Sequence, residues 1–365
     1  MLDGHGGNIK KMGNLYGLDP GEILDFSASI NPLGYPECVR SVILDRFDDI
    51  VNYPDSECSD LRSAIAAKYS CNKANIMVGN GSNELFYLIP RALKPEHSII
   101  LQPTFREFQD ALISANAEIT DVMNEDDTFP LFNLHDSQLK ECREEFIIFC
   151  NPNNPTGQLI SREEIVNFVE DNAERMVVID EAFMDFVEEE ERYSVLQDAC
   201  TLKNLIVVRS LTKFYGFPDL RLGFLVTSTP IMDKLWEFKE PWTVNLFAQV
   251  AGNIALADDG FTRKTREFVS SEKIFLYEGI SQIEGLHPFY PSVNFILIRI
   301  DNENIISSIL QNLLIKDKIV IRDCSNFVGL NEKYVRVAVR SRKENQRLLD
   351  AMKEAIRIAD SSVIM

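Results

Sequence analysis

The sequence lacks the features that mark membrane and exported proteins. It has no uninterrupted apolar run of the roughly 18 residues that a membrane-spanning helix needs. The amino terminus, MLDGHGGNIKK, has no apolar stretch like that of a signal peptide. We therefore expect a cytoplasmic protein that does not bind membranes.

Paired cysteines and an excess of basic charge are also missing. The seven cysteines are widely spaced and none forms a C-x-x-C pair, which argues against a disulfide framework and a zinc site. We expect reduced thiols and no metal. Lys and Arg number 37 against 56 Asp and Glu, a net charge of −19, so nucleic acid is not an expected partner.

The composition is that of an ordinary globular protein. The chain has 365 residues, of which 45% are hydrophobic and 25% charged, enough for one large or two medium domains. Between residues 76 and 228, short runs rich in Val and Ile alternate with longer amphipathic segments. This alternation predicts an α/β fold with a doubly wound, mostly parallel sheet. The expected strands are 76–78, 98–102, 146–150, 176–180, 205–209 and 224–227.

The pattern changes after Pro241. A long helical stretch to about Ile280 precedes expected strands at 293–300, 319–322 and 334–340 and a helical tail from Lys343. This order predicts a smaller α+β domain. We divide the chain into an amino-terminal arm with part of the small domain (1–45), a large domain (46–245) and a small carboxyl-terminal domain (246–365).

Two local patterns carry structural expectations only. Ser161 followed by Glu164 has the spacing of a helix capping box. The acidic run from Glu188 to Glu191 is most simply a solvated loop without function.

The segment from Ser210 to Gly223 follows an expected buried strand and contains Lys213. Ligands of α/β folds bind at the carboxyl ends of strands, where burial and cationic neighbours lower the pKa of a lysine and suit it to Schiff-base chemistry. A single lysine there is most simply an exposed surface residue. A catalytic role for Lys213 is therefore supported only if other segments of the chain contribute to the same site.

Three other segments are expected at the same sheet edge. Asn154 lies in FCNPNNPTG after one strand, and Asp180 ends another. GNGSNE, residues 79–84, follows a third strand and begins a helix, whose free N–H groups and dipole form a cradle for phosphate. Singly they are an ordinary turn, a possible helix cap and a tight turn. Together they describe a phosphorylated cofactor beside a lysine.

Ser210-x-x-Lys213, followed eight residues later by Arg221-x-Gly and preceded by Asn-Pro-Thr-Gly and Asp180-x-Ala, resembles the fold-type I pyridoxal phosphate (PLP) enzymes of the aspartate aminotransferase superfamily. The resemblance covers nearly the whole chain. It implies that the large domain binds PLP, that Lys213 forms a Schiff base with it and moves protons, and that Asp180 pairs with the protonated ring nitrogen. The other implied contacts are Asn154 at the ring 3-hydroxyl, Phe105 stacked on the ring, Ser82, Asn83, Ser210 and Arg221 at the phosphate, and Tyr53 reaching that phosphate from a partner subunit. A homodimer with shared active sites follows from the role of Tyr53.

Phe183 departs from the commonest pattern of the superfamily. Tyrosine usually follows Asp-x-Ala, and its hydroxyl shares the ring 3-hydroxyl with the asparagine. Phenylalanine removes that hydrogen bond, which tunes the pKa of the Schiff base. Phe183 also fits a simple role as a packed aromatic residue.

The two ends of the chain resemble the threonine-phosphate decarboxylase family. That family implies PLP-dependent decarboxylation of L-threonine O-3-phosphate to aminopropanol phosphate for cobalamin biosynthesis. The matching segments are HGGN at 5–8, DFSASINPLG at 25–34, IRDCSNFVGL at 321–330 and YVRVAVR at 334–340. The histidinol-phosphate aminotransferase family shares Asn-Pro-Leu-Gly and most cofactor motifs, and it is the alternative.

Two arginines fit a doubly anionic substrate. Arg322 lies near the end of one expected strand and Arg336 within the next, so two guanidinium groups can face one cleft and hold carboxylate or phosphate in bidentate fashion. We expect a small phosphorylated amino acid bound by Arg322 and Arg336, with His5 and Asn31 as further contacts. Arg340 reads as a surface ion pair.

Two other classes of protein fit less well. A nucleotide-binding dehydrogenase needs the third glycine of G-x-G-x-x-G, which residues 79–84 lack. A non-catalytic binding protein with the PLP fold could have lost Lys213 or Asp180, and both are present. The residues leave threonine phosphate and serine phosphate undistinguished.

Overall fold

The computed structural model describes residues 6–123, 133–135, 139 and 144–362. Its centre is a sheet of seven strands in the order β2-β8-β7-β6-β5-β3-β4. β3 to β7 are parallel, whereas β8 is antiparallel to its neighbours β2 and β7. The expected doubly wound, mostly parallel sheet is confirmed. The strands are β2 (Ile76–Asn80), β3 (His97–Gln102), β4 (Glu118–Met123), β5 (Phe146–Cys150), β6 (Met176–Asp180), β7 (Leu205–Ser210) and β8 (Leu222–Thr227).

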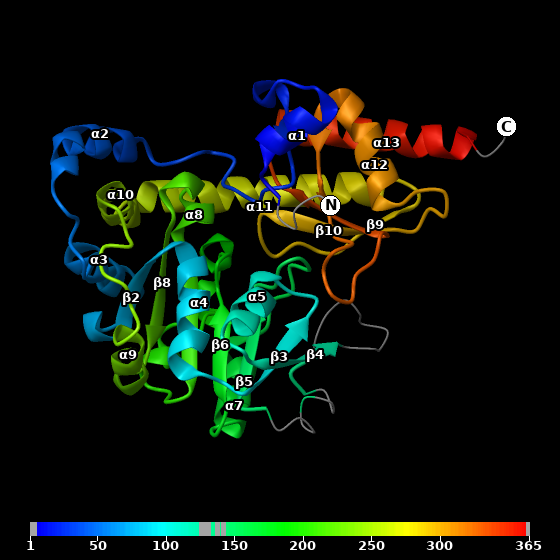
Figure 1. The fold of residues 1–365 in the computed structure, drawn as a ribbon. Coiled ribbons are helices and arrows are strands. Elements are labelled where there is room, and N and C mark those ends of the chain that lie inside the picture. Colours follow the sequence, from blue (N-terminus) through cyan, green and yellow to red (C-terminus); the bar gives the residue numbers. More distant parts are fainter. Residues whose placement is uncertain (1–5, 124–132, 136–138, 140–143, 363–365) are drawn as a thin grey trace.

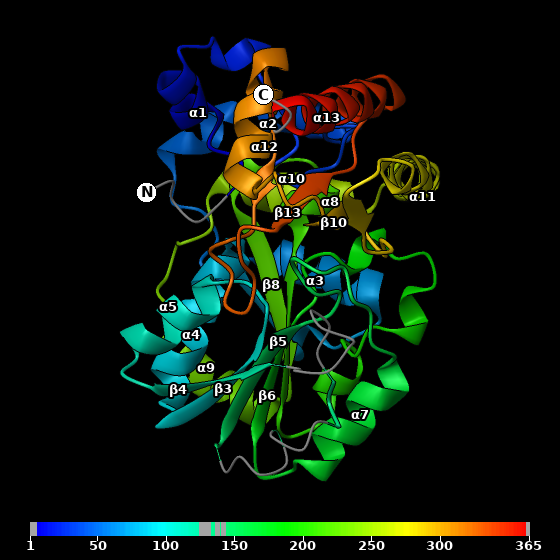
Figure 2. The same ribbon diagram turned by 90° about the vertical axis from the view of Figure 1, so that its right-hand side faces the viewer.

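Side chains of this sheet alternate between two apolar cores, one on each face. Ile147 and Phe149 belong to one core, and Ile148 between them belongs to the other. Figure 2 shows α4, α5 and α9 on one side of the sheet and α3 and α7 on the other. The helices around the sheet are α2 (Glu37–Asp45), α3 (Ser59–Tyr69), α4 (Gly81–Leu93), α5 (Glu107–Ser114), α7 (Arg162–Asp171), α8 (Leu211–Phe214), α9 (Thr229–Trp236) and α10 (Leu246–Leu256).

A smaller α+β unit lies beside the carboxyl ends of the parallel strands (Figure 1). Its antiparallel sheet has the order β12-β13-β10-β9, and a parallel pair joins β1 to β11. Leu24 and Phe26 pack into its core with residues of the carboxyl-terminal helix. Its elements are α1 (Ile9–Tyr16), β1 (Leu24–Asp25), β9 (Leu286–Pro288), β10 (Phe295–Ile300), α12 (Ser307–Leu314), β11 (Ile319–Val320), β12 (Arg322–Asp323), β13 (Tyr334–Ala338) and α13 (Arg342–Ser362).

Helix α11 (Asp259–Ser281) joins the two units and crosses between them in Figure 1. Val269 packs into a core of the large sheet, and Leu276 into the core of the small unit. The single long helical stretch expected after Pro241 is two helices, because Asp258 caps α11 by accepting the N–H of Phe261 at 2.8 Å.

Other local expectations have mixed outcomes. The cap at Ser161 is confirmed, since its hydroxyl accepts the N–H of Glu164 at 3.2 Å. Strand β4 was missed because it lies at the sheet edge with only Val122 buried.

The division of the chain at residues 46 and 246 stays a prediction. Helix α10, which follows the second boundary, packs on the core of the large sheet. Within the described residues, no helix combines the length and apolar character needed to cross a membrane.

Candidate active site

A cavity of about 650 Å³ lies between the carboxyl ends of the parallel strands and the small unit. Residues of the loops after β2, β3, β5, β6 and β7 line one side, and residues from β12 onward line the other. The strand ends converge here because neighbouring parallel strands all finish at one edge of the sheet. Ten of the expected site residues line it: Ser82, Asn83, Phe105, Asn154, Asp180, Ser210, Lys213, Arg221, Arg322 and Arg336.

Lys213 and Asp180 form a pair of opposite charge in this cavity. Burial lowers the pKa of Lys213 to about 8, with Arg221 and Arg336 acting in the same direction and Asp180 opposing them. Burial raises the pKa of Asp180 to about 7, although the N–H of Ala182 donates to its carboxylate at 2.9 Å. Both groups therefore change charge readily near neutral pH, as nucleophilic and proton-transferring groups require.

The start of α4 forms an anion cradle beside Arg221. Gly81 has φ +74°, and a Cβ atom there would lie 2.7 Å from Nη2 of Arg221. A Cβ on Gly223 would lie 2.5 Å from the backbone nitrogen of Ser82. Glycine is therefore needed at both positions to bring backbone N–H groups and the guanidinium together. Helix N-termini of this kind hold phosphate groups.

Hydroxyl groups complete the polar side of this cradle. Ser210, at the end of β7, lies with its hydroxyl 2.7 Å from that of Thr212. Nζ of Lys213 donates to the same Thr212 hydroxyl at 3.4 Å. A chain of polar groups thus runs from the lysine toward the anion cradle.

Arginines line the opposite side of the cavity. Nη2 of Arg336 donates to the carbonyl of Ser27 at 3.1 Å, and Nη1 contacts Oδ1 of Asn154. Arg322 donates to Oδ1 of Asn326 at 2.7 Å. Burial lowers the pKa of both guanidinium groups, to about 10 for Arg336. Both are therefore partly desolvated cations, a condition that favours binding of anions.

Arg340 also lines the cavity. From the sequence we expected only a surface ion pair at this position. It does form the ion pair, with Glu344 at 2.8 Å. Its Nη1 additionally donates to the carbonyl of Asp25 at 3.0 Å. The sequence did contain a signal for this placement. Arg340 is four residues after Arg336, and residues an even number apart share one face of an extended strand.

Phe183 is a packed aromatic residue, as expected. Its ring meets that of Phe295 edge-on, with centroids 5.0 Å apart. The guanidinium of Arg336 lies 5.0 Å from the same Phe295 ring. Phe183 thus supports the surface on which Arg336 lies.

Two other expected site residues lie elsewhere. Tyr53 is 83% exposed and packs on Trp242, with ring centroids 5.0 Å apart. Asn31 is buried and does not line the cavity, and its amide is bonded to backbone and to Thr265. This placement corrects the expectation that the Asn31 side chain contacts substrate. His5 lies outside the described residues.

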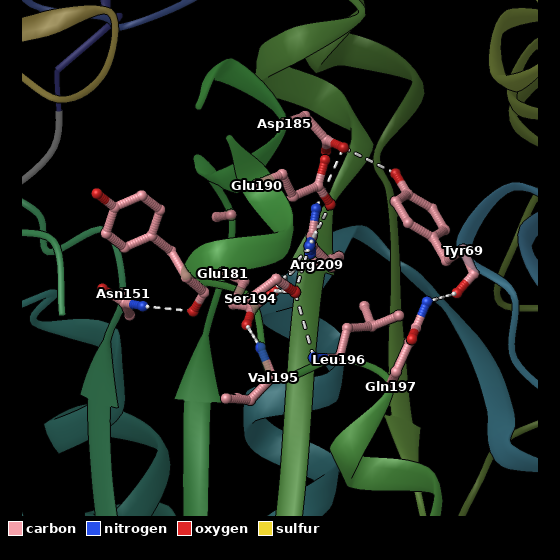
Figure 3. Close-up of polar contacts among 12 residues, drawn as sticks. Tyr69, Asn151, Glu181, Asp185, Glu190, Ser194, Val195, Leu196, Gln197 and Arg209 are labelled. Atoms are coloured by element: carbon pink, nitrogen blue, oxygen red, sulfur yellow. Dashed lines mark hydrogen bonds and ion pairs between the residues drawn. The ribbon is translucent and has the colours of Figure 1, made fainter. Parts of the chain in front are cut away.

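A buried charge network around Arg209 lies beside the strand ends (Figure 3). Arg209 and Glu181 directly neighbour Ser210 and Asp180, and side chains of adjacent strand residues point to opposite faces. Nε of Arg209, which is wholly buried, donates to Glu181 at 2.8 Å. The two strand ends that carry Asp180 and Ser210 are thereby tied together.

The same network reaches helix α11. Arg209 also binds Asp185 at 3.2 Å and Glu190 at 2.8 Å. Arg266 of α11 binds Glu190 at 2.7 Å and the carbonyl of Asp185 at 2.7 Å. Treating the acidic run from 188 to 191 as a solvated loop was therefore wrong for Glu190. Nothing in that run indicated a partner 19 residues away on a buried strand.

Comparison with known proteins agrees with this geometry. The family model "Aminotransferase class I and II" matches residues 21–352. The chain belongs to the aminotransferase class I and II family. Threonine-phosphate decarboxylase of Salmonella typhimurium is 35% identical over 96% of each chain.

Solved structures of this family share the fold. Histidinol-phosphate aminotransferase from Clostridium acetobutylicum superimposes with a TM-score of 0.85 and 28% identity, covering 92% of this chain and 100% of that one. L-threonine-O-3-phosphate decarboxylase from Porphyromonas gingivalis superimposes with a TM-score of 0.80 and 26% identity, covering 91% and 99%. The fold-type I architecture expected from the motifs is thus confirmed.

Proposed function

We propose that this chain is a PLP-dependent decarboxylase that converts L-threonine O-3-phosphate to aminopropanol O-phosphate, a precursor for cobalamin biosynthesis. The observation that carries the proposal is the placement of Arg322 and Arg336 in one cavity with Lys213 and Asp180. A substrate with both a phosphate and a carboxylate supplies the two anions that this many guanidinium groups accept. The 35% identity to the Salmonella decarboxylase supports the same reading.

The described residues fit PLP. A desolvated lysine suits attachment of the cofactor aldehyde, and an acid opposite it suits the ring nitrogen. The cradle at Gly81, Ser82 and Arg221 has the backbone donors and the cation that a phosphate needs. A Cβ atom at Gly81 or Gly223 would fill this cradle.

Each residue would have a separate task in holding the cofactor. Lys213 would carry the aldehyde carbon, and ionised Asp180 would keep the ring nitrogen protonated. Oδ1 of Asn154 contacts Arg336, so its Nδ2 would be free for the ring 3-hydroxyl. Phe105 would cover one ring face. The phosphate would be bound by Ser82, Asn83, Ser210, Arg221 and the partner subunit's Tyr53.

The bound cofactor supplies an electron sink for the bond broken at the substrate Cα atom. Arg322 and Arg336 would hold the substrate anions and so fix the orientation of the substrate, which decides the bond broken at Cα. Orientation of the carboxylate bond favours decarboxylation, and orientation of the Cα–H bond favours amino transfer. Nζ of Lys213 would move the proton to or from Cα.

We further propose a cytoplasmic homodimer. Exposed apolar side chains precede Tyr53 in the sequence, at Phe47, Ile50 and Val51, and the exposed Trp242 packs against its ring. Several large apolar side chains left exposed in one segment are typical of an interface between subunits. A second copy covering it would bring Tyr53 toward the neighbouring active site.

Histidinol-phosphate amino transfer is the second candidate, favoured by the TM-score of 0.85 to the Clostridium acetobutylicum enzyme. The two functions differ in their need for a second substrate. We expect the PLP-loaded protein to release carbon dioxide from threonine phosphate without any 2-oxo acid. Activity only with histidinol phosphate plus 2-oxoglutarate would favour the aminotransferase.

Serine phosphate provides the matched comparison within the decarboxylase reading. It lacks one methyl group, which changes binding in a pocket by about 1 to 3 kcal/mol. Measuring carbon dioxide release from both phosphoamino acids, at equal concentrations, decides which of them is the better substrate.

A further inference from the structure

Asn31 caps the short helix that carries Lys213. Helix α8 has only four residues, so the carbonyl groups of Lys213 and Phe214 have no partners further along the helix. The backbone N–H of Asn31 donates to the Lys213 carbonyl at 3.0 Å, and its side-chain Nδ2 donates to the Phe214 carbonyl at 2.6 Å. One residue from the amino-terminal segment thus satisfies both carbonyls.

The Asn31 side chain has no donor left for another ligand. A carboxamide carries two N–H groups. One binds Phe214, and the other donates to the hydroxyl of Thr265 at 2.9 Å. Oδ1 accepts the N–H of Leu33 at 2.9 Å. The residue is 4% exposed, so its bonds are held within the protein.

The segment that contains Asn31 also lies directly against the loop after Lys213. Gly216 has φ +65°, and a Cβ atom there would lie 2.1 Å from the carbonyl oxygen of Gly34. No side chain fits between these two backbones. Residues 31–34 and 213–216 therefore touch at both ends of a four-residue stretch.

Thr265 connects this contact to the helix that joins the two units. It is wholly buried on α11, next to Arg266, which binds Glu190 and Asp185 of the network behind the sheet. Asn31 therefore links the lysine helix to an element that is itself anchored to the strand ends.

We propose that Asn31 is a positioning residue for Lys213: it holds helix α8 against α11 and thereby sets the place of the lysine amino group in the cavity. This inference rests on the proposed function, in that Lys213 must be the residue that carries PLP. It assigns Asn31 to the lysine and not to the substrate.

The test uses Asn31→Ala and Asn31→Asp in the full chain, with Asn204→Ala as the matched control. Asn204 is also buried and also donates to backbone carbonyls, those of Val169, Asn172 and Arg175. It lies at the opposite end of β7, the strand that leads to Lys213. Loss of either amide removes bonds to backbone, but only loss of the Asn31 amide releases the lysine helix.

Two measurements separate positioning from a structural effect. The first is the rate at which cofactor-free protein takes up PLP, followed by absorbance, which requires no substrate. The second is the division of the activity loss between kcat and KM. A displacement of about 1 Å costs on the order of 100-fold in rate, so we expect both Asn31 variants to lose about 10- to 100-fold in PLP uptake and in kcat, with KM within about threefold of wild type.

The control should keep wild-type uptake and kcat even if its melting temperature falls. A rise in KM alone in Asn31→Ala, with normal uptake, would overturn the proposal in favour of a substrate contact. Equal effects in the Asn31 and Asn204 variants would reduce Asn31 to a general stabilising residue.

A third variant of this contact keeps the test decisive if the two Asn31 variants fold poorly. Thr265→Val keeps the volume and removes only the hydroxyl that binds Asn31, and we expect a several-fold slower PLP uptake. Unchanged uptake in this variant overturns the link through α11. Failure of the proposed function is recognised separately. If the wild-type protein takes up PLP but releases no carbon dioxide from threonine phosphate, the substrate assignment is wrong and the role of Asn31 is unaffected.

Discussion

The pKa of Lys213 provides the sharpest quantitative prediction. Burial, assisted by Arg221 and Arg336 and opposed by Asp180, lowers it from an ordinary value of 10.5 to about 8. At pH 7 about one in eleven Lys213 side chains is then unprotonated, compared with about one in 3,000 for an ordinary lysine. Lys213 should therefore react about 300-fold faster at that pH than a lysine of the same nucleophilicity without this environment.

Competitive labelling of the cofactor-free protein tests this directly. A small uncharged acylating reagent is applied at a series of pH values, with an N-acetyl-lysine amide as internal standard, and the Lys213 peptide is quantified by mass spectrometry. We expect its reactivity to rise about tenfold per pH unit below pH 8 and then to level off. Arg221→Met removes one of the causes and should move the inflection to higher pH. Reactivity that keeps rising in parallel with the standard up to pH 10 would refute the reasoning.

Arg209→Met should destabilise the fold by about 3 to 5 kcal/mol, because the buried carboxylates of Glu181 and Asp185 lose their guanidinium partner. The ion pair of Arg192 with Glu189 is exposed, so Arg192→Met should cost less than about 1 kcal/mol; urea unfolding measures both. The Arg209→Met variant should also lose stability as pH rises above the ordinary carboxyl range, because burial raises the pKa of Glu181 and of Asp185 and both carboxyls then bind protons more tightly in the folded than in the unfolded chain; a pH-independent cost would contradict this. Arg336→Lys keeps the charge but loses the bidentate geometry, so kcat/KM should fall about 30-fold or more with the cofactor absorbance unchanged, and an unchanged kcat/KM would remove Arg336 from the substrate site. Tyr53→Phe should leave the dimer intact by sedimentation and weaken PLP binding about tenfold, and unaltered PLP affinity would argue against the contact across subunits.

The meeting of Lys213, Asp180 and Asn154 in one cavity could be predicted because each has a local sequence signal. Lys213 and Asn154 follow buried strands with a clear pattern and Asp180 ends another, and parallel strands bring their ends to one edge. The order of the motifs along the chain then identified the family. No knowledge of side-chain orientation was needed for this part of the site.

The remaining residues depend on orientation, which the sequence does not contain. Asn31 belongs to a motif at the right place, but the turn directs its amide to the lysine helix and away from the cavity. From the sequence, Arg209 is simply the polar end of an apolar strand. Its partners Glu181, Asp185 and Glu190 are 28, 24 and 19 residues away. Such pairings follow only once the strands and the loop are packed.

Covalent attachment of PLP to Lys213 is the claim on which the account depends. Borohydride reduction of the loaded protein, followed by digestion and mass spectrometry, reports the modified residue directly. We predict a phosphopyridoxyl adduct on the peptide that contains Lys213, and neither adduct nor yellow colour in Lys213→Ala. An adduct on another lysine, or a colourless wild-type protein with no adduct, would contradict the account.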